Sequence, residues 1–423
     1  MKVEIEIMEY NMSKSAVLDK SIQYWNPGKT KQWQTDGVDL VIGEREDYFL
    51  YDMEGKKLMD LHLNGGTYNL GHRNQEIISS LKEAMDHFDI GNHHFPSTAR
   101  AQLAEQFDKC TPDNLRYSIF SSGGGEAIDV AIKSARYATK RRKVVSLKYA
   151  YHGHTGIAVS LGNERYSKLF LSEGSPDEVV NVLFNDLDEM ERALSKEDVA
   201  CVIIETIPAT YGFPLPDPGY LEETKRLCEK YGTLYVADEV QTGLLRTGKL
   251  WGFEHHNIKP DIMVTAKGLS GGIYPIAATI VSDKVGQWMN EDGFAHISTF
   301  GGSELGCVVA MKVLEISQRS ETIENVDYTS RYIRSGLERI KNQYSDQFTG
   351  IRQKGVILGL EFEKTDGAKD IMRSLYDNGV WAIYSMLDTK VLQFKPGLLL
   401  DQQYCDDLLN RVETSIGQAV RKM

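Results

Sequence analysis

The chain has 423 residues, with 48 Lys and Arg against 60 Asp and Glu, so its net charge is −12. Nucleic acids and anionic membranes would repel such a surface, and we expect neither as a partner. With 41% hydrophobic and 26% charged residues the chain can bury a large core, which excludes a disordered or collagen-like protein.

The start of the chain, residues 1–15, lacks the basic opening, the unbroken apolar core and the cleavage site of a secretory signal. We therefore expect the protein to begin at or near Met1 and to be cytoplasmic. No apolar run reaches the roughly 20 residues that a membrane-spanning helix needs, so no membrane span is expected. The cysteines are odd in number and never form a CxxC pair, which favours reduced thiols and predicts no zinc site. They are Cys110, Cys201, Cys228, Cys307 and Cys405.

The first predicted element in chain order is a β-hairpin at residues 48–62 that turns around Gly55. We assign residues 1–75 to an N-terminal segment that packs with a smaller domain at the other end of the chain. From residue 76 to 310, short apolar strands alternate with amphipathic helices. The strands are predicted at 115–120, 143–150, 201–207, 233–240 and 261–266, with helices that begin at Glu126 and Gly219.

Continuous apolar strands joined by helices are typical of a parallel sheet that is covered on both faces. Residues 76–310 are therefore predicted to form a large, doubly wound α/β domain with a mostly parallel sheet. Residues 311–423 mix strands at 356–363 and 391–400 with a long polar helix at 322–344, which indicates a smaller α+β domain. Two such domains would leave a cleft between them.

The segment SSGGGEAIDVAIKSARYA, residues 121–138, places three glycines between a predicted strand and a helix. Such a turn lets backbone N–H groups approach an anion at the positive end of the helix dipole, so it can hold a phosphate. For one such motif alone, a tight turn without any ligand is the simpler alternative. A dinucleotide fingerprint is excluded, because Ile128 stands where its third glycine belongs and the next strand offers Lys148 in place of an acid.

Two further strand ends carry side chains that can do chemistry. TLYVADEV delivers Asp238 and Glu239 where open α/β sheets bind ligands, although such an acid often only caps the next helix. DIMVTAKG delivers Lys267 beside Gly268. Desolvation there lowers the pKa of an amine and makes it a nucleophile, whereas most lysines are solvated surface groups.

These parts together match what pyridoxal phosphate (PLP) needs. The cofactor requires a phosphate site, a carboxylate that keeps its pyridine nitrogen protonated and a lysine that forms an imine. Tyr151 ends the strand at 143–150 and is placed to stack on the ring, and Val240 could press on the opposite face. On its own, Tyr151 can equally be an ordinary tyrosine at a strand end.

The motifs SSGGGEAIDVAIK, YHGHTG, IIETI, ADEVQTGLLRTGKLWGFEH, PDIMVTAKGLSGG and STFGG occur in the order and spacing of the class III aminotransferases, which are PLP enzymes of fold type I. The chain resembles this family over nearly its whole length, most strongly from residue 117 to 310. The resemblance implies that Lys267 forms the Schiff base and that Asp238 pairs with the pyridine nitrogen. It also implies a homodimer with shared active sites, in which Thr299 reaches the phosphate of the other subunit's site. The further cofactor contacts that it implies are Gly124, Gly125, Tyr151, His152, Val240 and Gln241.

The chain departs from the family pattern at several positions. Gly125 replaces the usual hydroxyl residue of the phosphate loop. We therefore expect backbone amides and Thr299 to make more of the hydrogen bonds to the phosphate. His154 replaces an Arg, while Thr206 and Ser303 replace a Pro and an Asn. The sequence alone offers no physical reason for these three changes.

The largest departure is Gln393, where many members use an Arg to grip the α-carboxylate of the substrate. An amide has neither the charge nor the fork geometry of a guanidinium. Glu205, which pairs with that Arg in some members, would be left without its partner and could hold a cationic or hydroxyl-rich substrate such as an amino sugar or a polyamine. Lys395, Arg73 or Arg246 could supply a substitute cation.

The leading hypothesis is a PLP-dependent aminotransferase that moves an amino group between a small-molecule amino donor and a carbonyl acceptor. An amine, an amino sugar or an amino acid would be the substrate, and Lys267 would act in turn as acid and base. The alternative is a PLP-dependent amino-acid racemase, epimerase or aminomutase on the same scaffold. A non-catalytic protein would have no use for Lys267 and Asp238. No histidine group has metal-ligand spacing, so no metal is expected.

Overall fold

The structure is a computed structural model that describes residues 12–91, 94–175 and 177–422. Residues 1–11, which carry the prediction about the start of the protein, and His93 lie outside this part of the chain. In the helices that are described, none is long and apolar enough to span a bilayer.

A sheet of seven strands forms the centre of the larger part of the molecule, in the order β4-β10-β9-β8-β7-β5-β6. β10 runs antiparallel to both of its neighbours, and every other pair is parallel. The predicted α/β fold with a mostly parallel sheet is confirmed. The strands are β4 (Leu115–Ser121), β5 (Lys143–Leu147), β6 (Val179–Val182), β7 (Val199–Glu205), β8 (Leu234–Asp238), β9 (Ile262–Thr265) and β10 (Ala277–Ser282).

Helices cover both faces of this sheet, because its central strands are apolar on both sides. On β7, Cys201 and Ile203 pack in the cluster that contains α6 (Gly124–Thr139). Val202 and Ile204 point to the opposite face, where a second cluster gathers. The helices that contribute to this second cluster are α4 (Gln75–Met85), α5 (Thr98–Cys110), α8 (Leu187–Leu194), α9 (Tyr220–Lys230) and α12 (Glu304–Ser317).

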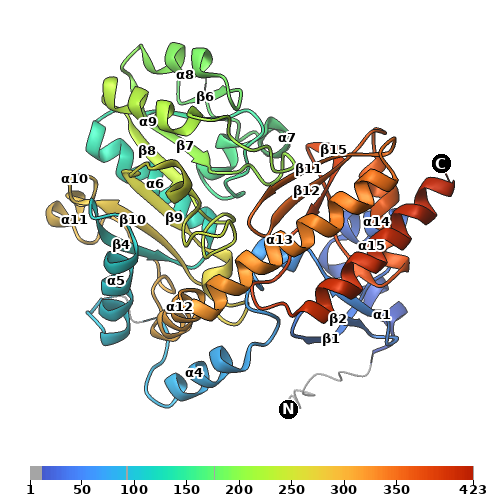
Figure 1. Cartoon of the computed structure of the whole chain (residues 1–423). Coiled ribbons are helices and arrows are strands. Elements are labelled where there is room, and N and C mark those ends of the chain that lie inside the picture. Colours follow the sequence, from blue (N-terminus) through green and yellow to red (C-terminus); the bar gives the residue numbers. More distant parts are fainter. Residues whose placement is uncertain (1–11, 92–93, 176, 423) are drawn as a thin grey trace.

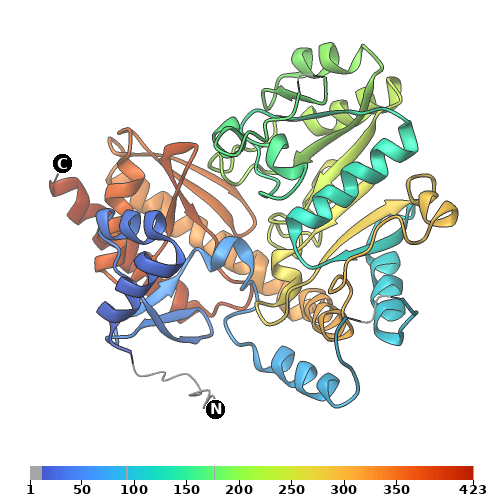
Figure 2. The same cartoon turned by 180° about the vertical axis from the view of Figure 1, so that it is seen from behind.

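The two ends of the chain meet in two smaller sheets (Figures 1 and 2). The first has the order β1-β2-β3-β13, and β3 pairs in parallel with β13 across more than 300 residues of sequence. The second has the order β11-β12-β15-β14 and is antiparallel throughout. The strands are β1 (Ile42–Glu46), β2 (Phe49–Asp52), β3 (Lys57–Asp60), β11 (Phe348–Lys354), β12 (Ile357–Phe362), β13 (Val380–Trp381), β14 (Ile383–Ser385) and β15 (Asp388–Phe394).

One apolar cluster joins these two sheets to the helices beside them. In Figure 1 the N-terminal elements α1, β1 and β2 lie together with the C-terminal elements α14 and α15, apart from the green and yellow elements of the large sheet. Whether the domains divide at residues 75 and 310 stays a prediction. The helices of this part are α1 (Lys14–Lys20), α2 (Pro27–Thr35), α13 (Ser320–Gln343), α14 (Gly367–Asp377) and α15 (Gln402–Lys422). The shorter helical turns are η1 (Ser21–Trp25), α3 (Leu63–Gly66), η2 (Ala158–Leu161), α7 (Glu164–Lys168), η3 (Gly252–His256), η4 (Lys267–Ser270), α10 (Asp283–Gly286) and α11 (Trp288–Glu291).

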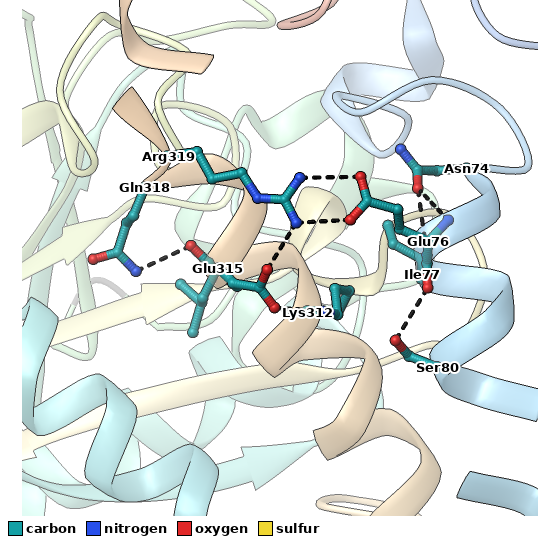
Figure 3. A network of polar contacts seen from close by, with 9 residues as sticks. Asn74, Glu76, Ile77, Ser80, Lys312, Glu315, Gln318 and Arg319 are labelled. Atoms are coloured by element: carbon teal, nitrogen blue, oxygen red, sulfur yellow. Dashed lines mark hydrogen bonds and ion pairs between the residues drawn. The ribbon is translucent and has the colours of Figure 1, made fainter. Parts of the chain in front are cut away.

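A salt bridge ties α4 to the junction between α12 and α13. Figure 3 shows that the Arg319 guanidinium donates hydrogen bonds to both carboxylate oxygens of Glu76. Their N–O distances are 3.0 and 2.7 Å. The guanidinium also donates to the Glu315 carboxylate at 2.7 Å. The Arg319 hydrogen bonds hold the pKa of Glu76 below its usual value. Asn74 begins α4 by accepting hydrogen bonds from the backbone N–H groups of Glu76 and Ile77.

Candidate active site

Three neighbouring parallel strands bring charged side chains to one edge of the large sheet. β7 ends at Glu205, β8 ends at Asp238 directly opposite, and Lys267 follows β9. A cavity of about 200 Å³ opens at this edge. It is lined by Gly124, Gly125, Tyr151, His152, Gly153, Glu205, Asp238, Val240, Gln241, Ala266 and Lys267.

The amine at this edge is held in an unusual backbone turn. Lys267 has a φ of 45°, a left-handed conformation that costs energy for any residue with a side chain. The turn at Leu63–Gly66 packs on its aliphatic chain, so closely that a Cβ added at Gly65 would lie 3.1 Å from the Lys267 Cε. Burial lowers the pKa of the Lys267 amine, against the opposing effect of Asp238 and Glu205.

The carboxylate at the end of β8 is buried and fully engaged. Its Oδ2 lies 2.6 Å from the His152 Nδ1, and its Oδ1 accepts a hydrogen bond from the Val240 N–H at 3.0 Å. The other ring nitrogen of His152 lies 3.2 Å from the Ser146 Oγ. Both Asp238 and His152 are 3% exposed. Because both nitrogens of His152 are used in this way, the imidazole fixes the Asp238 carboxylate in place.

The glycine turn before α6 borders the cavity and is crowded at Gly125. α6 begins at Gly124, so its first N–H groups face the cavity. A Cβ at Gly125 would lie 2.6 Å from the Thr155 Oγ1. Thr155 therefore stands beside the turn where the family's usual hydroxyl residue would project, which the sequence did not indicate.

Tyr151 and Val240 both line the cavity. The Tyr151 ring meets His154 edge-on, with centroids 5.0 Å apart. His154 in turn lies against Tyr166, 4.8 Å between centroids, so it belongs to an aromatic cluster that supports Tyr151. This explains the histidine that replaces the family's arginine.

The remaining two unexplained residues also have structural roles. Thr206 donates a hydrogen bond from its Oγ1 to the buried Glu239 carboxylate, 2.6 Å away. Glu239 also accepts from Thr242 and from the backbone N–H groups of residues 252 and 253, while burial raises its pKa to about 7. Ser303 caps α12, because its Oγ accepts from the Gly306 N–H at 3.3 Å.

Glu205 has partners other than an arginine. Its carboxylate accepts hydrogen bonds from the N–H groups of Tyr151 at 3.0 Å and Ala209 at 3.1 Å. Burial, and to a smaller degree the charge of Asp238, raises its pKa to about 7. Gln393 does not face Glu205 directly: its Nε2 donates to the Ala209 carbonyl and to the Ser385 Oγ, both at 2.9 Å.

The three candidate cations differ sharply in their surroundings. Arg73 is exposed and borders a separate surface groove. Arg246 is buried, but its guanidinium donates to the carbonyls of Pro396 and Val356, and burial lowers its pKa to about 9. Lys395 is buried, and its Nζ lies 2.5 Å from the Gln393 Oε1.

Thr299 stands apart from the other predicted cofactor contacts. It is exposed and does not border the cavity. It lies in a segment with three exposed apolar side chains, Phe294, Ile297 and Phe300, which are 63%, 49% and 53% exposed. The structure thus brings every other predicted cofactor contact to one cavity and leaves Thr299 on the surface.

Sequence reasoning missed His62 and the turn that follows it. His62 lies at the end of β3, 3.4 Å from the Lys395 Nζ, and burial together with the charges of Lys395 and Lys267 pushes its pKa well below the usual value. The signal in the sequence was the Asn-Gly-Gly run at residues 64–66, which together with Leu63 has four consecutive positive φ angles and forms the tight turn. Within the described residues, no group of three or more His, Cys, Asp or Glu side chains could hold a metal ion.

Comparison with known proteins decides the family. The profile of class III aminotransferases matches residues 31–416. The chain belongs to the class III aminotransferase family. An uncharacterized aminotransferase of Archaeoglobus fulgidus is similar to it, with 44% identity over 393 residues that cover 93% of this chain and 92% of that protein.

Solved structures with the same fold include other aminotransferases. The ornithine aminotransferase of Toxoplasma gondii superimposes with a TM-score of 0.87, covers 97% of each chain and is 24% identical. A transaminase from a marine Virgibacillus has a TM-score of 0.89, covers 96% of this chain and 99% of its own and is also 24% identical. Members of the class III family are enzymes that use PLP, so the expectation that the chain is an enzyme is confirmed.

Proposed function

We propose that this protein is a PLP-dependent aminotransferase that moves an amino group from a small-molecule amino donor to a carbonyl acceptor. The observation that carries the proposal is that Lys267 and Asp238 lie at the ends of adjacent strands and line one cavity. The N-terminus of α6 borders the same cavity. An amine, an amino sugar or an amino acid is the proposed substrate.

The residues around the cavity suit PLP. The N–H groups at the start of α6, beside Gly124 and Gly125, would receive the phosphate, because a helix N-terminus attracts anions. Asp238 would face the pyridine nitrogen, Gln241 the ring hydroxyl, and Tyr151 and Val240 the two ring faces. When bound, PLP withdraws electrons from the carbon that carries the substrate's amino group.

The chain's own residues supply the proton chemistry. The Lys267 amine has a pKa lowered by burial, so a larger fraction of it is neutral and able to accept a proton. Lys267 is thus the proposed base that removes the proton from the substrate's carbon and the acid that passes it to the carbon on the other side of the transferred nitrogen. Asp238 would face the pyridine nitrogen of the cofactor, and His152 holds that carboxylate in position.

We also propose a homodimer with shared active sites. Thr299 is exposed in a segment whose apolar side chains, Phe294, Ile297 and Phe300, face solvent in the single chain. Exposed apolar groups of this kind often mark an interface with another protein. A cytoplasmic location remains part of the proposal, supported by the absence of any disulfide among the five cysteines.

Single-donor spectroscopy tests the function. Protein loaded with PLP is mixed with glutamate, alanine, a diamine or an amino sugar, without acceptor, and the visible absorption of the cofactor is followed. We expect one donor to change the absorption and a carbonyl acceptor to restore it. Lys267→Ala should abolish the change, whereas Lys249→Ala, at an exposed lysine, should not. If the absorption persists while the compound's α-hydrogen exchanges with deuterated water, the protein is a racemase or epimerase instead.

A further inference from the structure

Lys395 is a buried cation beside the proposed active site. It is the first residue after β15, and only 1% of its surface is exposed. Its Nζ lies 2.5 Å from the Gln393 Oε1, 3.4 Å from the His62 Nδ1 and 5.3 Å from the centre of the Phe213 ring. Amide, imidazole and aromatic ring are all uncharged partners when His62 is neutral.

The charge around Lys395 is not balanced by the protein. No carboxylate in the described residues forms an ion pair with its Nζ. Burial and the positive charges of Arg246 and Lys267 hold the pKa of Lys395 well below its usual value, and Asp60 offsets this only in part. The Asp60 carboxylate is itself engaged by His72 and by two backbone N–H groups. A buried ammonium in this position lacks a counterion.

Two short paths connect Lys395 to the cavity wall. The first runs from its Nζ to Gln393, from Gln393 to the carbonyl of Ala209, and from the N–H of Ala209 to Glu205, which lines the cavity. The second runs through His62, which begins the turn that packs on the Lys267 side chain. Side chains two residues apart on a strand share a face, so Lys395 and Gln393 point to the same side.

The other charged groups near the cavity are less suited to hold a substrate. Arg246 is occupied by two backbone carbonyls. Glu205 already accepts two backbone N–H bonds, and with a pKa of about 7 it is partly protonated at neutral pH. It therefore offers only a partial negative charge to a cationic substrate.

We infer that Lys395 binds a carboxylate of the substrate while the substrate's amino group is held at Lys267. The inference rests on the proposed function and narrows its substrate class to amino acids, in place of amino sugars and simple amines. On binding, the carboxylate takes the place of the Gln393 Oε1 as the acceptor for the Lys395 Nζ. The substrate thereby supplies the counterion that the protein lacks, which makes the contact a charge-assisted hydrogen bond.

Calorimetry with unreactive ligands tests this without turnover. PLP-loaded protein is titrated with butanoate and, separately, with 1-butanol, which lacks the charge. We expect butanoate to bind and butanol not to bind. Lys395→Met, which keeps the length but not the charge, should weaken butanoate binding by at least about 10-fold, and Lys395→Arg should keep most of it. Lys390→Met, on the same strand and with no contact to the site, is the matched control.

Paired donors extend the test to the reaction. Alanine is compared with ethylamine, and 4-aminobutanoate with 1-aminopropane, because each pair differs only by the carboxylate. Lys395→Met should raise the half-saturating concentration of the amino acid at least about 10-fold and leave that of the amine nearly unchanged. Because Lys395→Met removes a buried charge that has no counterion, its free energy of unfolding should be at least as large as that of wild type, as urea unfolding measures.

The outcomes separate the two proposals. If no donor changes the cofactor's absorption, the proposed function is wrong, while butanoate binding still decides the role of Lys395. Equal butanoate affinity in wild type and Lys395→Met, no butanoate binding at all, or equal losses for an amino acid and its amine counterpart would each overturn the role of Lys395.

Discussion

The Nδ1 of His152 lies 2.6 Å from the Oδ2 of Asp238, and both side chains are almost completely buried. This pair joins the segment after β5 to the end of β8, two strands apart in the sheet. The arrangement fixes the acid that would face the cofactor ring before any ligand binds, so the site is preorganised.

Asp238→Ala should cripple turnover while the protein still folds. The variant removes the carboxylate that would keep the cofactor ring cationic, and we expect the half-reaction rate to fall at least about 100-fold. Stopped-flow absorption with the best donor measures the rate, and far-ultraviolet circular dichroism checks the fold. A rate near that of wild type would contradict the assignment of Asp238.

His152→Phe should have a smaller effect of a different kind. The variant keeps an aromatic ring but loses both nitrogen contacts, with Asp238 and with Ser146. We expect the half-reaction to slow by about 10-fold and the pH titration of the bound cofactor's absorption to move, because Asp238 is no longer held in place. A packing role alone would leave that titration where it is in wild type.

Glu239 should make the stability of the fold depend on pH. Burial raises its pKa from about 4.5 to about 7, so between these values the folded protein holds a proton that the unfolded chain has released. The free energy of unfolding therefore falls as the pH rises through this range. In Glu239→Gln the fall from pH 5 to pH 7.5 should be smaller by up to about 3 kcal/mol, as measured by urea unfolding. Glu363→Gln, at an exposed site, should leave the fall unchanged.

Gly125→Ser should weaken the binding of PLP. A Cβ at this position would lie 2.6 Å from the Thr155 Oγ1, which is too close for the two side chains to keep their positions. Because either Thr155 or the turn at Gly125 must shift, we expect the dissociation constant of PLP to rise by about 10-fold, as fluorescence titration measures. Adding Thr155→Ala should make room for the serine and recover most of the loss. Unchanged affinity in the single variant would show that the loop yields without cost.

Phe300→Asp should break the proposed homodimer. The substitution places a charge among exposed apolar side chains next to Thr299, where a partner subunit would have to bury it. Light scattering should report a dimer for wild type and a monomer for the variant, with weaker retention of PLP. Met386→Asp, in the turn between β14 and β15, serves as the control. A monomeric wild type would refute the proposal.

The chemistry at the sheet edge could be predicted because it depends on local patterns. Asp238 and Lys267 each follow an apolar strand, and parallel strands bring their carboxyl ends to one edge. Lys395 and His62 could not be placed in this way. They are separated by 333 residues in sequence and meet because β3 and β15 pack in the same apolar cluster.

The structural roles of single residues that depart from the family pattern were even harder to predict from the sequence. The role of Thr206 is explained by its hydrogen bond to Glu239. The role of Thr155 is explained by its position next to Gly125. Both are contacts of side chains across turns, which depend on distances of a few ångströms that no spacing rule encodes. The sequence could flag these positions as unusual, but their partners had to be seen.

The parallel pairing of β3 with β13 has a consequence for how the protein is made. On the ribosome, residues 57–60 emerge long before residues 380–381, so β3 remains an open strand edge for most of synthesis. His62 and the turn that packs on Lys267 follow this strand directly. Lys267 therefore receives its final neighbours only when nearly the whole chain has been translated, and a truncated product would expose the strand edge without completing the proposed active site.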